Sequence, residues 1–170
     1  MRRMIILCVA ATIPAGCAPP EPQGRQEIVK LSDGIQLVAQ MREFNPERHR
    51  LTYCEPERVC LIDDHPAFGT EGAAPRLEIT RLLLLVNGDT VALEHRGMYN
   101  PWSPVEGESL HVELAQDSPT ELRVRGEFSD GAAAYVAEWL VVQGASVRVA
   151  IDCVECLAMT CAKHLGPTQR

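Results

Sequence analysis

The chain has 170 residues and a formal net charge of −7 at pH 7, with 23 acidic and 16 basic side chains. This acidic balance argues against nucleic acid and anionic lipid headgroups as partners. The length allows one domain with a sizeable core, which we expect at residues 27–165, followed by a polar tail at 166–170.

The first residues have the layout of a secretory signal peptide. Arg2 and Arg3 precede an apolar run, Met4–Ile13, which is about half as long as the roughly 20 residues of a membrane-spanning helix. Ala15 and Gly16 then precede Cys17. In this arrangement residues 1–22 resemble a bacterial lipoprotein signal, in which a cysteine is diacylated and becomes the mature N-terminus.

The resemblance implies that residues 1–16 are removed and that Cys17 is lipidated. Residues 17–26 would then hold the acylated cysteine and a stiff, proline-rich tether to the membrane. Pro14 stands where the family usually has a branched apolar residue. Ala18 is not the Asp that commonly retains such proteins in the inner membrane. If the organism is Gram-negative, the resemblance therefore implies the inner leaflet of the outer membrane, facing the periplasm.

Residues 27–44 fit two structures. Ile28, Leu31, Ile35 and Val38 lie near helical spacing, but Asp33-Gly34 between them is a typical hairpin turn. A helix and a β-hairpin both stay open for this segment.

Most of the remaining chain predicts antiparallel strands, because apolar and polar residues alternate around 91–93, 110–114, 122–128 and 147–153. In the last strand, Val147, Val149, Ile151 and Cys153 are expected on one face, opposite Arg148 and Asp152. Leu82–Val86 and Tyr135–Val142 lack this alternation and predict central strands. The turn signals are Asn87-Gly88, Asp130-Gly131 and Gln143-Gly144.

The C-terminal segment has a helical pattern. Val154, Leu157, Ala158, Cys161 and Leu165 recur at steps of three and four residues. We therefore expect a mainly β fold with minor α: an antiparallel β-sandwich or bent meander sheet, capped by a short C-terminal helix.

Five cysteines follow Cys17, and an exported chain folds in an oxidising space. Cys54 and Cys60 flank a short turn between two strand-like runs, so we expect a disulfide across this hairpin. Cys153, Cys156 and Cys161 cannot all pair with one another. One bridge and one remaining thiol is the simplest outcome.

The same C-terminal cysteines allow a sharper hypothesis. Cys153, Cys156, Cys161 and His164 form C-x2-C-x4-C-x2-H, a ligand set that Zn²⁺ or Cu⁺ accepts. A structural bridge is favoured over this metal site, and a redox-active thiol pair is the third alternative. Such a pair usually opens a helix beside a βαβ unit, whereas the pattern here is antiparallel.

Two other stretches are candidate binding sites. Asp63, Asp64 and His65 could ligate a cation, but a polar strand end is the favoured interpretation. His111 is expected in solvent. The segment Glu94–Pro104 concentrates Met98, Tyr99 and Trp102 in a loop, and these side chains either pack against the end of the sheet or form a recognition loop.

The sequence favours a lipid-anchored, periplasm-facing binding or interaction module, for example a stoichiometric inhibitor or immunity protein with a basic protein partner. No cofactor is expected. One alternative is a metal-binding lipoprotein that uses the Cys/His cluster. Another is an envelope hydrolase, which would need a cleft lined by His65 and carboxylates. No catalytic motif such as G-x-S-x-G or H-E-x-x-H occurs, so an enzyme is not the favoured interpretation.

Overall fold

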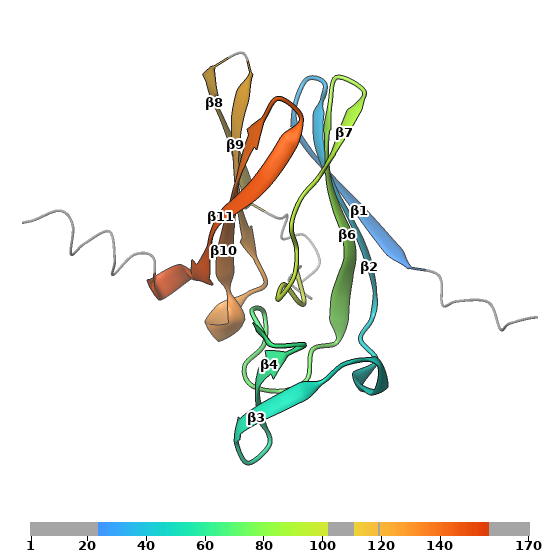
Figure 1. Ribbon diagram of the computed structural model, residues 1–170, viewed down its shortest axis with the longest axis vertical. Coiled ribbons are helices and arrows are strands. Elements are labelled where there is room, and N and C mark those ends of the chain that lie inside the picture. Colours follow the sequence, from blue (N-terminus) through green and yellow to red (C-terminus); the bar gives the residue numbers. More distant parts are fainter. Residues whose placement is uncertain (1–23, 102–110, 119, 157–170) are drawn as a thin grey trace, which may run out of the picture.

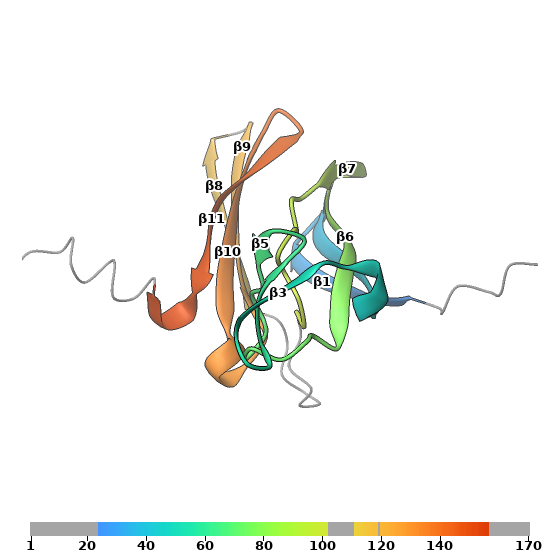
Figure 2. The same ribbon diagram turned by 60° about the horizontal axis from the view of Figure 1, so that its bottom comes forward.

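A computed structural model describes residues 24–101, 111–118 and 120–156 of the chain. Two four-stranded antiparallel sheets lie face to face in this structure, with strand orders β1-β2-β6-β7 and β11-β10-β9-β8. Figures 1 and 2 show them as two layers, with a small third sheet, β3-β4-β5, beyond one end. The predicted mainly β fold is confirmed, and of its two forms the structure has the sandwich.

Each large sheet comes from one half of the chain. The first contains β1 (Arg25–Ser32), β2 (Ile35–Glu43), β6 (Leu77–Val86) and β7 (Asp89–Ala92). The second contains β8 (His111–Ser118), β9 (Glu121–Phe128), β10 (Tyr135–Val142) and β11 (Ala145–Cys153). Between β2 and β6 the chain forms the 3₁₀ turn η1 (Pro46–Arg48) and the small sheet of β3 (Leu51–Glu55), β4 (Arg58–Ile62) and β5 (His65–Pro66). A second 3₁₀ turn, η2 (Gly131–Ala133), joins β9 to β10.

The first segment is a hairpin and not a helix. β1 begins at Arg25, two residues before the expected start of the domain, and pairs with β2 across Asp33-Gly34. Gly34 has a φ of 77°, a left-handed conformation that glycine adopts without strain. The turn chemistry therefore outweighed the helical spacing of the apolar residues.

The core lies between the two large sheets. Inward-facing residues of β2 and β6 meet those of β9 and β10, and the largest of them are Trp139, Tyr135 and Phe128. Phe128 stacks on Tyr135 with ring centroids 5.3 Å apart and meets Trp139 edge to face at 6.0 Å. Burial of each such side chain stabilises the fold by about 1.5–3 kcal/mol, so this cluster holds the layers together.

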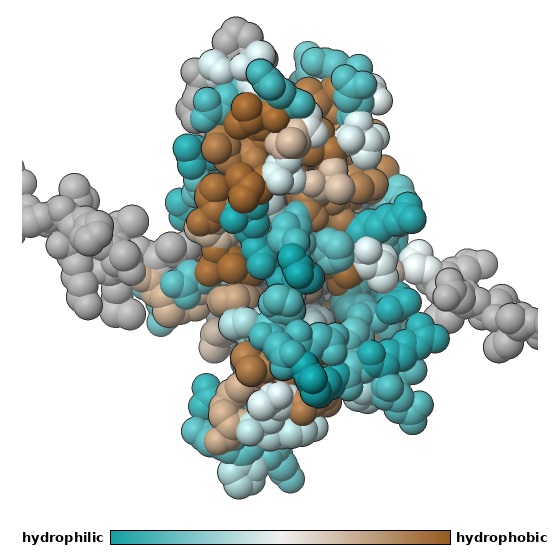
Figure 3. All heavy atoms as spheres, viewed as in Figure 1, coloured by the Kyte–Doolittle hydropathy of each residue, from teal (hydrophilic) through white to brown (hydrophobic). Residues whose placement is uncertain are grey.

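The prediction for the faces of β11 is wrong over half of the strand. Val147 and Val149 are 55% and 48% exposed, whereas Arg148 is half-buried. The register with β10 shifts between Glu138 and Trp139, which is a β-bulge that reverses the side-chain alternation. Figure 3 shows apolar surface over this part of the molecule, and hydrophilic surface over much of the opposite, small-sheet end.

Turns of both large sheets gather at one end of the sandwich. Figure 1 shows the β1–β2, β6–β7 and β10–β11 connections at the top, near the adjoining ends of β8 and β9, and we call this region the hairpin end. Asn87-Gly88 and Gln143-Gly144 form two of these turns, as predicted. Asp130-Gly131 also marks a connection, but it belongs to the longer link through η2 at the opposite end.

The C-terminal helix is only partly within the described residues. Val154–Cys156 is helical, and the backbone N–H of Val154 donates to the carbonyl of Ala134 at 3.2 Å. The rest of the expected helix lies outside the described residues, as do the signal segment and Cys17. Within the described ranges, no helix has the length and apolar character needed to cross a membrane.

Candidate functional site: an apolar pocket at the hairpin end

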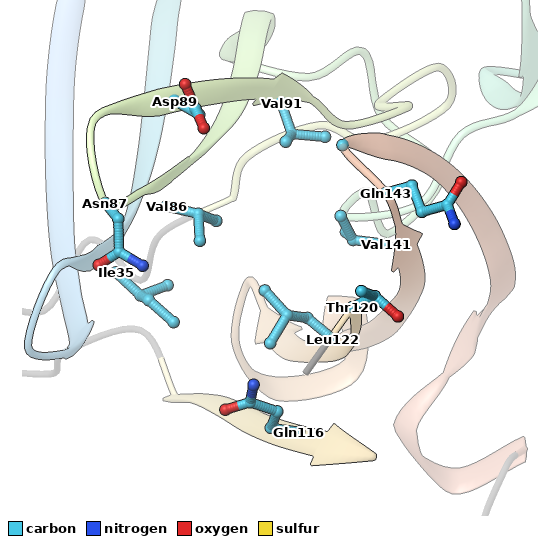
Figure 4. Close-up of a pocket in the computed structure, with 11 residues that line it drawn as sticks. Ile35, Val86, Asn87, Asp89, Val91, Gln116, Thr120, Leu122, Val141 and Gln143 are labelled. Carbon is cyan, nitrogen blue, oxygen red and sulfur yellow. The ribbon is translucent and has the colours of Figure 1, made fainter. Parts of the chain in front are cut away.

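The hairpin end holds a pocket of about 320 Å³ between the two sheets. Its walls are apolar and come from both layers. Figure 4 shows the apolar side chains turned toward a shared space. These residues are Ile35, Val86, Val91, Leu122 and Val141. Pockets of this size with mostly apolar walls are typical of ligand-binding sites.

Neighbouring hairpins are tied in pairs around this pocket. The backbone N–H of Asn87 donates to the carbonyl of Gly34 at 2.8 Å, which joins the two turns of the first sheet. The N–H of Gln143 donates to the carbonyl of Thr120 at 3.2 Å, which joins the two turns of the second. These bonds fix the turns of each layer, and the pocket opens between the turns of the two layers. We call the polar residues around this opening the rim.

Among the described residues, the rim is polar and carries one charged side chain. Asn87, Gln116 and Gln143 supply carboxamides, and Asp89 supplies the carboxylate. Within the described part of the chain, the side chains of these four residues make no hydrogen bond or ion pair. They are therefore available to a ligand, and carboxamides can both donate and accept hydrogen bonds.

The loop with Met98 and Tyr99 does not project into solvent. Met98 is 2% exposed and Tyr99 7%, and Tyr99 packs with Val59 and Ile62 beneath the small sheet. For Met98 and Tyr99 the structure therefore has the packed alternative, because burial of the two side chains removes more apolar surface from water than projection into solvent would. Trp102 lies outside the described residues.

Side chains of the second sheet hold this loop in place. We call residues 92–99 the strap. Four of its backbone carbonyls accept hydrogen bonds from β10 and β11: Trp139 Nε1 donates to Glu94 at 2.9 Å, Arg148 Nη1 to Arg96 at 2.8 Å, Tyr135 Oη to Tyr99 at 3.2 Å and Ser146 Oγ to Ala92 at 2.5 Å. The inward position of Arg148, created by the bulge in β11, is thus used to fasten the strap.

The two tyrosines near the strap stay protonated. Burial raises the pKa of Tyr99 to about 12, with smaller contributions from the charges of Asp63 and Glu78. Burial also raises the pKa of Tyr135 well above its ordinary value. Both hydroxyls are therefore hydrogen-bond donors at neutral pH and not bases.

A second, more polar pocket of about 220 Å³ lies where the small sheet meets the strap. Three of the five histidines in the chain line it: His49, His65 and His95. Asp63 and Glu78 also line it, so the cleft with His65 and carboxylates that the hydrolase alternative requires is present.

The carboxylates of this second pocket are already engaged. Glu78 is buried, accepts a hydrogen bond from Arg42 Nε at 2.5 Å, and has Oε2 2.9 Å from Nε2 of His49 without hydrogen-bond geometry. His49 Nδ1 lies 2.6 Å from Oδ2 of Asp63, and its ring stacks on Phe44. We call Arg42, His49, Asp63 and Glu78 the charged cluster, and its internal pairing indicates a structural role.

Asp63 and Asp64 form the turn between β4 and β5, and His65 is the first residue of β5. The hydrogen bond from His49 and the N–H of Arg50, 2.8 Å away, together lower the pKa of Asp63. Asp64 pairs with the guanidinium of Arg50. These contacts support the simpler interpretation as a polar strand end for both aspartates. His111 is exposed, as expected, beside Glu113.

The cysteines form two pairs within the described residues. Cys54 and Cys60 lie at disulfide distance across the β3–β4 hairpin, with Cα atoms 5.9 Å apart, as predicted. Cys153 and Cys156 also lie at disulfide distance, with Cα atoms 5.1 Å apart. Cys161 and His164 lie outside the described residues. The second bridge occupies two of the four ligands of the proposed metal site.

One group of metal-ligand residues converges within the described ranges. Asp152, Cys153 and Cys156 place their ligand atoms within 4.8 Å of one another. Because a disulfide sulfur is a far poorer ligand than a thiolate, the closed bridge does not fit a zinc or copper ion.

A comparison of the chain with protein-family models, curated proteins and solved structures finds no match in any of the three. The arrangement of its own residues is therefore what bears on function.

Sequence reasoning missed the apolar pocket and the charged cluster. The pocket residues are spread from Ile35 to Gly144, and only the turn signals beside them were visible. Glu78 offered a weak signal, since it is an isolated acid at the start of an apolar strand.

Proposed function

We propose that the protein is a lipid-anchored envelope binding module that accepts an apolar side chain of a partner protein in its hairpin-end pocket. The lipid anchor rests on the resemblance of residues 1–22 to a lipoprotein signal. The observation that carries the binding function is the pocket itself, with apolar walls from both sheets and a rim of polar side chains that have no partner within the described ranges.

The walls define the kind of group that fits. Five aliphatic side chains and no described aromatic one line the pocket, so a flexible aliphatic group such as Leu, Ile or Met suits it. The three rim carboxamides can pair with the backbone N–H and C=O groups on either side of that residue, which a peptide segment supplies and a bare hydrocarbon does not.

The negative charge of the rim predicts which residue of the partner lies beside the inserted side chain. Asp89 is the charged side chain among the described rim residues, and the chain carries a net charge of −7. A basic residue beside the inserted side chain would pair with Asp89, and the field of an acidic domain speeds the approach of a basic partner. The proposed partner is therefore a basic envelope protein that presents an apolar residue next to Lys or Arg.

A displayed-peptide selection tests this proposal. The protein is purified from membranes, and its mass reports whether Cys17 carries acyl chains. A random peptide library is then selected against it. We expect enriched peptides with an aliphatic residue near Lys or Arg, and a loss of binding of about tenfold or more in Val86→Trp, which fills the pocket.

Matched variants make the result specific. Val147→Trp introduces the same side chain on the exposed face of β11 and should leave binding unchanged. Asp89→Asn keeps the shape of the rim and should weaken binding about threefold while reducing its salt dependence. Peptides that bind Val86→Trp as well as the wild type, or that lose affinity to Val147→Trp instead, would place the binding surface elsewhere.

A further inference from the structure

We infer that Cys153 and Cys156 form a redox-active pair that exchanges with a dithiol of a partner protein, in addition to the binding function proposed above. The inference does not depend on the hairpin-end pocket. It rests on where the pair lies, on what already fixes the backbone around it, and on the groups that surround the two sulfur atoms.

The bridge adds little to a backbone that other contacts already hold. Cys153 ends β11 and pairs with Tyr135 of β10, and Val154 is fixed by the hydrogen bond to Ala134. The two cysteines are three positions apart, so the bridge closes a single turn. A bridge over so short a loop constrains the unfolded chain weakly, since the entropic effect grows with loop length.

The other bridge lies in a different setting. Cys54 and Cys60 join two strands of the small sheet, and the register between these strands shifts on both sides of Tyr53. Most residues of β3 are exposed, so few apolar contacts hold this hairpin. Here the disulfide holds together a hairpin that has few packing contacts of its own. This pair therefore serves as the internal structural control.

The surroundings of the sulfur atoms suit exchange. The backbone N–H of Cys156 donates to Sγ of Cys153 at 3.0 Å, and this contact stabilises negative charge on Cys153 when the bridge opens. Both cysteines are partly exposed, so a partner thiol can approach. The carboxylate of Asp152 lies within 4.8 Å of both sulfurs and disfavours a thiolate there, which biases the pair toward the disulfide.

These contacts assign a direction to the exchange. A thiolate of the partner dithiol attacks Sγ of Cys156, the Cys153–Cys156 bond breaks, and Cys153 leaves as the thiolate that the N–H stabilises. The second partner thiolate then attacks the partner sulfur of the mixed disulfide and releases Cys156. The partner becomes a disulfide, and two electrons and two protons pass to Cys153 and Cys156.

Part of the evidence for a redox-active pair was visible in the sequence. C-x-x-C was visible, but the antiparallel pattern before it argued against a redox pair. The structure places the pair where the antiparallel strand β11 ends and the helical turn Val154–Cys156 begins, and this turn brings the N–H of Cys156 to Sγ of Cys153.

Graded reduction of the full-length protein tests the inference. The protein, with Cys161→Ser to prevent reshuffling, is equilibrated with dithiothreitol at rising concentration, and each bridge is followed by alkylation and peptide mass. We expect Cys153–Cys156 to open at a concentration about tenfold or more below that for Cys54–Cys60. Opening of both bridges together, or of Cys54–Cys60 first, would overturn the inference.

Two further measurements separate exchange from simple exposure. Asp152→Asn keeps an acceptor oxygen but removes the charge, and should favour the dithiol by about threefold, whereas Glu155→Gln in the same turn should not. With glutathione as the probe, the mixed disulfide should map to Cys156. Equal effects of the two substitutions, or a mixed disulfide on Cys153, would contradict the assigned mechanism.

Discussion

The two ends of the sandwich are built on opposite principles. At the hairpin end, apolar side chains of both sheets face a pocket that is open to solvent, and no charged pair closes it among the described residues. At the small-sheet end, the charged cluster joins the first sheet to the small sheet through Arg42, Glu78, His49 and Asp63. One end leaves its polar groups available, and the other uses them to hold the fold together.

The largest expected effect is at the charged cluster. Glu78→Ala leaves Arg42 and His49 without the buried carboxylate between them and should lower the free energy of unfolding by about 3–5 kcal/mol. Urea unfolding measures this change. Glu27→Ala, which breaks the exposed pair with Arg25, is the matched control and should cost less than about 1 kcal/mol. Similar losses in the two variants would show that the cluster is not a structural tie.

The next largest effect is the difference between two valine-to-alanine substitutions, one in the closed core and one in the pocket. Val124→Ala removes methyl groups from a fully buried site and should cost about 2 kcal/mol, because it leaves a cavity. Val86→Ala only enlarges a pocket that already opens to solvent and should cost less than about 1 kcal/mol. Thermal unfolding of the two variants gives the comparison. An equal cost would mean that the hairpin end is closed in solution.

The smallest effect is the response to acid at Glu94, in the strap. The hydrogen bonds from Arg96, outweighing the opposing effect of burial, lower the pKa of Glu94 to about 2 from 4.5. A carboxyl with a lowered pKa stabilises the folded state above its ordinary pKa, and this contribution is lost as the pH falls from about 4.5 toward 2. Because the side chain is 34% exposed, solvent screening reduces the loss to about 1 kcal/mol.

Urea unfolding at pH 6 and at pH 3 measures this response. Glu94→Gln removes the titration and should flatten the dependence between the two pH values. Glu121→Gln, at the hairpin end, is the control and should leave it as in the wild type. An unchanged slope in Glu94→Gln would assign the acid response to other carboxyls, such as Asp63, whose pKa is also lowered.

Local patterns predicted the mainly β fold, as a sandwich or a bent meander sheet, because strands and tight turns are specified by neighbouring residues. The turn at Asn87-Gly88 and the alternation of Leu122 and Val124 each depend on a few neighbouring residues. The faces of β11 failed because a one-residue bulge opposite Glu138 and Trp139 reverses the alternation, and nothing within β11 itself marks it.

The candidate sites could not be predicted from such local patterns. The charged cluster depends on the register that places Arg42 opposite Glu78, and the apolar pocket depends on four hairpins that end together. Neither can be derived from one strand at a time. The Cys54–Cys60 bridge was predictable because both of its ends belong to a single hairpin.

The strap has a consequence for how the chain folds. Its carbonyls, at residues 92–99, find their donors 36 to 54 positions later in the chain. Contacts of such long range slow folding, and β-sandwiches of this kind typically fold in milliseconds to seconds. The first sheet therefore cannot complete its own core while it emerges alone. During synthesis the strap lacks these donors until Trp139 and Arg148 have been made, so we expect the final folding step to follow the completion of β10 and β11.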